Sequence, residues 1–168
     1  MTCNTDLSDA DKQSTVTDDE ILIRLISYPG CISENKELSP EIFSLYHKDE
    51  DYVSVNREYY MSIEDSMKHG INIRKWPFRG DRFWGAVKLN AGDIRGISNR
   101  ILVESHYKPD YKAHAGISYI LDSGDKLKHT GDEIIPSWLL SIQLKLCESV
   151  LEVIEGVEES RSQVVIGS

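Results

Sequence analysis

Four residues carry side chains that could do chemistry together if folding brought them to one place: Arg24, Ser54, Arg95 and His114. Histidine exchanges a proton near neutral pH, and arginine binds phosphate and carboxylate groups through its planar fork. Small residues surround His114 at positions 113–116, so an extended backbone would leave its imidazole open to a ligand. This set predicts a small enzyme that acts on a phosphate- or carboxylate-bearing small molecule.

Each of these residues also suits an ordinary structural role. Because no partner stands at ligand spacing from His114, a histidine hydrogen-bonded at a sheet edge is the more common arrangement. Ser54 lacks the G-x-S-x-G context of a nucleophile, and Arg95 follows a helix-capping signal. Arg24 lies inside an apolar run, where it must reach solvent or pair with an acid, because burying an unpaired charge is costly.

Metal-binding patterns are weak in this chain. His106, His114 and His129 follow one another around two expected strands, but they have neither HxH nor HExxH spacing. The three cysteines have no CxxC spacing, which argues against a zinc ribbon or a disulfide framework and favours a reducing cytoplasm. We therefore expect no metal and no cofactor.

The most distinctive local composition is a basic and aromatic patch in residues 74–84. Its cations and rings include Arg74, Lys75, Trp76, Arg79, Arg82 and Trp84. Such a surface could hold phosphates and stack on bases, but the net charge of −9 opposes nucleic acid, so we expect no such partner. The patch could instead bind an acidic protein, or its rings could fill the edge of the core while its cations stay in solvent.

Short apolar runs separated by turn residues predict the central strands at 21–26, 85–89, 101–104 and 113–121. Capping spacing from Asn90 predicts a short helical connection over 91–97. The fold class that follows is α+β, with a mixed or antiparallel sheet of about four strands in a single domain.

A long amphipathic helix is predicted from residue 138 to about residue 157, packed against the sheet. About 20 residues would span roughly 30 Å. Its apolar face is wide enough for a second contact beyond the sheet, so the helix is a candidate surface for a partner chain.

The two ends of the chain differ in composition from its middle. Residues 1–19 are polar and acidic, which predicts a disordered tail. We expect residues 20–159 to form the globular domain and residues 160–168 a loose C-terminal tail. The N-terminus has no apolar segment of the kind found in signal peptides, and no apolar run approaches the length of a membrane span. We expect a cytoplasmic protein with no membrane partner.

Two stretches resemble an uncharacterised group of small bacterial proteins. They are residues 38–43 (LSPEIF), followed by 53–55 (VSV), and the later residues 113–117 (AHAGI). The group usually has a proline before Ala-His-Ala, where this chain has Lys112. The resemblance extends over residues 21–121 and implies a bacterial origin and no particular activity.

Because the chain has no catalytic motif, its sequence favours function through protein–protein interaction, as an accessory or an immunity- or defence-type component. The partner would be another protein or a second copy of the chain, bound through the C-terminal helix or the basic and aromatic patch. The alternative is the small enzyme. The two hypotheses differ in whether Arg24, Ser54, Arg95 and His114 converge on one pocket.

Overall fold

The computed structural model describes residues 8–26, 31–73, 85–129 and 135–155, so the basic and aromatic patch lies outside the described residues. In chain order the elements are α1 Asp9–Ser14, β1 Ile21–Ile26, the 3₁₀ helix η2 Pro40–Phe43, β2 Val53–Arg57, α2 Ile63–Ile73, β3 Gly85–Asn90, α3 Ala91–Ile97, β4 Ile101–Ser105, β5 His114–Tyr119, α4 Ser137–Glu148 and β6 Glu152–Glu155.

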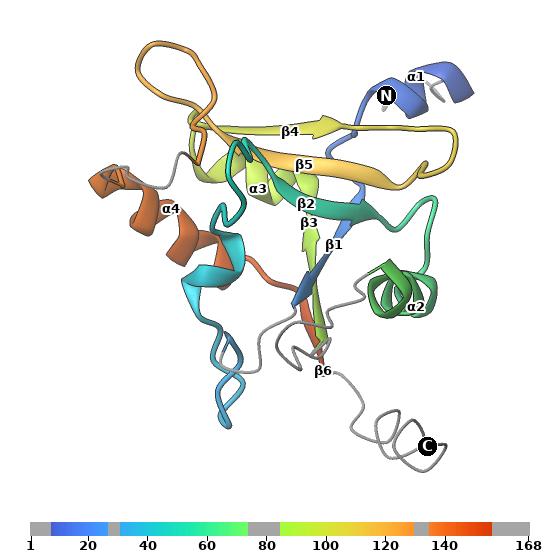
Figure 1. Cartoon of the computed structure of the whole chain (residues 1–168), viewed down its shortest axis with the longest axis horizontal. Helices are drawn as coiled ribbons and strands as arrows, with labels where there is room; N and C mark the ends of the chain where they lie inside the picture. The colour runs from blue at the N-terminus through green and yellow to red at the C-terminus, as the bar shows by residue number, and fades with distance from the viewer. Residues whose placement is uncertain (1–7, 27–30, 74–84, 130–134, 156–168) are drawn as a thin grey trace, which may run out of the picture.

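The described strands form one six-stranded sheet in the order β4-β5-β2-β1-β3-β6, and every pairing in it is antiparallel (Figure 1). The prediction of a single α+β domain with a C-terminal helix packed on its sheet is confirmed. The predicted number of strands was too low, because β2 and β6 complete the sheet. The predicted helical connection is α3, and the Asn90 side chain caps it by accepting from the Asp93 amide at 2.9 Å.

The predicted C-terminal helix was too long. α4 has 12 residues, and the chain then turns so that the Leu151 amide donates to the Lys88 carbonyl and β6 pairs with β3. Val153 and Ile154 continue the helical stripe in sequence, but β-branched residues also suit a strand. The unpaired edge of β3 decides between the two, because extended pairing satisfies its backbone groups.

The sheet has two faces with different surroundings. Alternate strand residues, such as Leu22, Val55, Val87 and Ile117, point to the core face, where they pack with η2, α3 and α4. Figure 1 shows α2 on the opposite side of the sheet from α4. We call this second side the pocket face.

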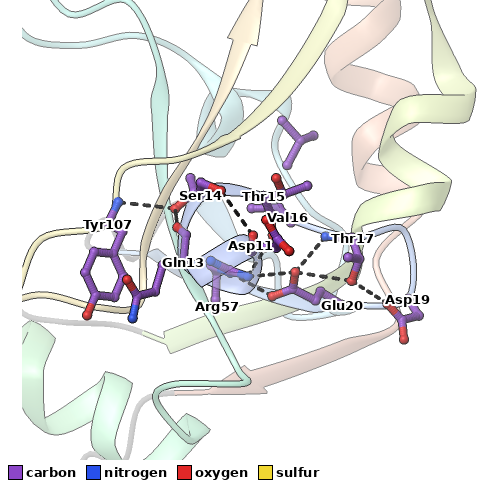
Figure 2. A network of polar contacts seen from close by, with 12 residues as sticks. Asp11, Gln13, Ser14, Thr15, Val16, Thr17, Asp19, Glu20, Arg57 and Tyr107 are labelled. Carbon is purple, nitrogen blue, oxygen red and sulfur yellow. Dashed lines mark hydrogen bonds and ion pairs between the residues drawn. The ribbon is translucent and has the colours of Figure 1, made fainter. Parts of the chain in front are cut away.

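The N-terminal segment was predicted to be disordered, but residues 8–19 include α1 and pack on the sheet. Val16 is buried in the core. The Arg57 guanidinium donates from Nε to Glu20 Oε1 at 2.7 Å and from Nη2 to Glu20 Oε2 at 2.9 Å (Figure 2). Arg57 also donates to the Thr15 carbonyl and lies over the ring of Tyr60. Composition suggested disorder because it does not reveal that Val16 packs in the core or that the distant Arg57 bonds to the Thr15 carbonyl.

A second set of polar contacts holds the same segment. Arg95 of α3 pairs with Asp18 and donates to the Val16 and Val103 carbonyls. The Ser105 hydroxyl donates to the Gln13 carbonyl at 2.5 Å. These contacts connect residues before β1 to α3 and β4, so the segment is an integral part of the domain.

We predict that Glu20→Ala lowers the free energy of unfolding by about 3–5 kcal/mol, because it leaves a buried, unpaired guanidinium at Arg57, which is 1% exposed. Asp122→Ala is the control, since Asp122 pairs with Arg100 but is 89% exposed, and it should cost at most about 1 kcal/mol. Urea denaturation followed by circular dichroism measures both. Equal, small losses would show that the pair does not hold the fold together.

Candidate ligand-binding site

A cavity of about 140 Å³ lies where β1 and β2 separate. These strands are paired only at Leu22↔Arg57 and Ile23↔Asn56, so their remaining residues leave space between them. The cavity is lined by the diverging parts of both strands, by His69 and Gly70 of α2, and by Tyr111 from the connection between β4 and β5.

Five rings, here called the ring cluster, extend from this cavity: Tyr52, His69, His106, Tyr111 and His114. Of these, His69 and Tyr111 line the cavity. Tyr111 stacks on His114 with ring centroids 4.8 Å apart and meets His69 edge-on at 4.4 Å. Tyr52 stacks on His106 at 4.2 Å. The cluster therefore continues from the cavity wall across the pocket face to β4 and β5.

Strand register and one glycine make room for these rings. His114 lies opposite Asn56, and the His106 amide donates to the His114 carbonyl, which places the two imidazoles side by side. A Cβ atom on Gly116 would lie 2.7 Å from Tyr52 Cδ2 and 2.8 Å from His106 Nε2. Only glycine lets these two rings lie this close to the strand.

Three nitrogens of the ring cluster are buried and have no hydrogen-bond partner among the described residues: His69 Nε2, His106 Nε2 and His114 Nδ1. The other ring nitrogen of His114 lies 3.4 Å from the Tyr52 hydroxyl. Buried polar atoms in folded proteins are nearly always hydrogen-bonded, to protein, water or a ligand. Three such atoms in one cluster mark it as a candidate binding site.

The histidines of the ring cluster favour the neutral form. Burial lowers the pKa of His114 to about 4, aided by the nearby His106 and Lys108. Burial also lowers the pKa of His69, and burial together with Lys126 lowers that of His106. At neutral pH each imidazole therefore has one donor and one acceptor nitrogen.

Two of the four predicted catalytic residues lie on the pocket face. Ser54 lies opposite Gly116 in the register, so its side chain and that of His114 are diagonal neighbours on adjacent strands. Ser54 also lines the cavity. His114 points away from Ala115 and Ile117, which are buried in the core, as the expected alternation requires.

The two arginines extend into other surroundings. The Arg24 guanidinium donates to the Ile42 carbonyl at 2.9 Å and to the Ser54 carbonyl at 3.0 Å. Its charge acts on the pKa values of Cys31 and Tyr119, both buried on the core face. Arg95 is bonded to Asp18 and to two carbonyls beside α3. The four predicted residues therefore do not meet in one pocket, although Arg24 and Ser54 both line the cavity.

Sequence reasoning missed the part played by His69 and Tyr111. Neither residue is among the candidates drawn from the sequence. A usable signal was present in β2, where the polar residues Tyr52, Ser54 and Asn56 alternate with the apolar residues of the core face. That alternation indicates a polar second face, but it does not reveal which helix covers it.

Metal and membrane interpretations gain no support from the described parts of the chain. Within these ranges no group of three or more histidine, cysteine or acidic side chains could hold a metal ion, and His129 lies away from the ring cluster, in a groove beside α4. No described helix is long and apolar enough to cross a bilayer.

No family model matches the chain, and no curated protein or solved structure matches it. The resemblance to a group of small bacterial proteins stays a prediction. The argument for function therefore depends on the geometry of the chain itself.

We predict that stability falls as pH decreases from about 6.5 toward 4, in part because of His114. Its pKa is lower in the folded state than the usual 6.5, so the unfolded chain binds the proton first. His114→Gln should make the loss less steep by at most about 1.4 kcal/mol per pH unit. Urea denaturation at pH 7.5, 6 and 5 measures the slope, with His47→Gln, an exposed position, as control. Identical slopes for wild type and His114→Gln would contradict the burial of a neutral imidazole.

Proposed function

We propose that the chain binds a small molecule in the cavity between β1, β2 and α2. The observation that carries this proposal is the cavity itself, about 140 Å³ in volume, on which Ser54 of β2, His69 of α2 and Tyr111 converge from three separate parts of the chain. A concave space lined by apolar side chains and a few convergent polar groups is the usual form of a small-molecule site.

The groups around the cavity are suited to proton transfer as well as to binding. The Ser54 hydroxyl and the His69 imidazole come from different elements and line the same space. A neutral imidazole is the form that accepts a proton from a bound molecule. Of the two arginines expected to bind a phosphate or carboxylate substrate, Arg24 lines the cavity and donates to the Ser54 carbonyl, whereas Arg95 is bonded to Asp18 beside α3.

We predict that uncharged fragments of six to nine heavy atoms shift the amide NMR signals of Gly70 and Tyr111, which border the cavity. Ser54→Ile should abolish these shifts, because it fills the cavity with a residue that suits a strand. Ser123→Ile, at an exposed turn position, is the control and should bind as the wild type does. Fragment binding that persists in Ser54→Ile would contradict the proposal.

We also propose a second candidate function, self-association through the outer surface of α4. Leu140 and Leu144 lie one turn apart there and are 52% and 45% exposed. The charged residues of this helix, Lys145 and Glu148, balance each other, whereas the whole chain carries −9. A second copy could approach here with little repulsion, and an antiparallel pairing would bring Lys145 toward the copy's Glu148.

We predict that the mass of the wild-type chain, measured by sedimentation equilibrium, rises above 19.1 kDa with increasing concentration. Leu144→Ser should shift this rise to a concentration at least about tenfold higher, since it removes apolar area from the contact. Leu102→Ser is the control, because Leu102 is 36% exposed but lies on β4, away from α4. A monomer at every concentration up to about 1 mM would exclude this candidate.

A further inference from the structure

The lining of the cavity differs in charge from the molecule as a whole. The chain has 28 acidic residues against 19 lysines and arginines, for a net charge of −9. Among the described residues no acid lines the cavity, whereas Arg24 does. Its bond to the Ser54 carbonyl brings the guanidinium of a β1 residue to β2, across the gap in which the cavity lies. A positive charge at this position of an acidic protein favours an anion there.

Asn56 supplies a hydrogen-bond donor in a fixed orientation. Its side chain lines the cavity, and the Tyr111 hydroxyl donates to its Oδ1. That bond leaves the two N–H groups of Nδ2 for another acceptor. Nδ2 bonds to no described residue, and it is not among the described polar atoms that are both buried and without a partner. It is therefore accessible, and the accessible space beside Asn56 is the cavity.

Ser54 adds a second donor on the same face of β2. Residues two apart in a strand point to the same side, about 7 Å from each other. Both Ser54 and Asn56 line the cavity. A carboxylate accepts through two oxygens, so it can take one hydrogen bond from each residue. Hydrogen bonds to an ionised acceptor are roughly twice as strong as those between neutral groups.

The same lining suits a carboxylate better than a phosphate. A phosphate monoester carries a charge of about −1.5 to −2 at pH 7. Arg24 is the one arginine or lysine in the described lining, and it already donates to the Ile42 and Ser54 carbonyls. A single negative charge therefore matches the lining. Because the cavity is open to solvent on one side, the lining recognises a head group and the rest of the ligand can extend outward.

We propose that the ligand is a carboxylate, whose two oxygens accept from the Asn56 amide and the Ser54 hydroxyl beside the positive charge of Arg24. This inference depends on the proposed small-molecule binding at the same cavity. Tyr111 acts as a positioning residue, because its bond to Oδ1 determines which end of the Asn56 amide meets the ligand.

The experiment titrates the full chain at pH 7.5 with benzoate and with benzamide, an uncharged molecule of nearly the same shape, and follows the amide NMR signals of Gly70 and Tyr111. We expect benzoate to bind about tenfold more tightly than benzamide, which corresponds to about 1.4 kcal/mol. Equal affinities would overturn the inference and leave small-molecule binding intact. Tighter binding of phenyl phosphate than of benzoate would overturn the choice of a carboxylate. No shifts with any of the three probes would overturn both the inference and the proposed function.

Two variants test the residues named. Asn56→Asp keeps an acceptor for the Tyr111 hydroxyl but replaces the donor with a second carboxylate oxygen, so it should abolish the preference for benzoate. Asn99→Asp makes the same change at an exposed turn position outside the cavity and should keep the preference. Loss of the preference in both variants, or in neither, would contradict the role of Asn56. Ser54→Ala removes the other donor and should reduce the preference, which keeps the test decisive even if Asn56→Asp does not fold.

Discussion

The buried ion pair between Arg57 and Glu20 is the constraint on which much of this fold depends. Arg57 ends β2 and is almost entirely buried, so its charge requires a partner inside the protein. Glu20 supplies both carboxylate oxygens from the residue just before β1. The pair thereby holds β1 beside β2 at the one place where these strands meet in register, Leu22↔Arg57 and Ile23↔Asn56.

The cavity is a consequence of how little of β1 and β2 is paired. Beyond Ile23 the two strands diverge, and their backbones are no longer paired. There the Arg24 guanidinium donates to the Ser54 carbonyl. The Arg24 side chain thus satisfies a carbonyl that backbone pairing between longer strands would have satisfied. The same divergence opens the space that His69 and Tyr111 border on the pocket face.

The two faces of the sheet serve different purposes because of strand alternation. The core face buries Leu22, Val55 and Ile117 against η2 and α4, which supplies most of the apolar burial. The pocket face carries polar and ring-bearing residues that do not pack in the core, including Ser54 and His114. Gly116 shows how closely the two sets are fitted, since the rings of Tyr52 and His106 occupy the volume of its missing side chain.

The sequence by itself determined β1, β3, β4 and α3 to within a residue or two, because local apolar spacing and the Asn90 cap are encoded by neighbouring residues. It also placed His114 on an extended segment with its imidazole open to a ligand. Only the tertiary structure decided the end of α4 at Glu148, the pairing of β6 with β3, and the meeting of His69, Tyr111 and His114. Those features depend on partners distant in the chain, such as the Lys88 carbonyl that accepts from the Leu151 amide. No local pattern records which distant group will satisfy an unpaired strand edge.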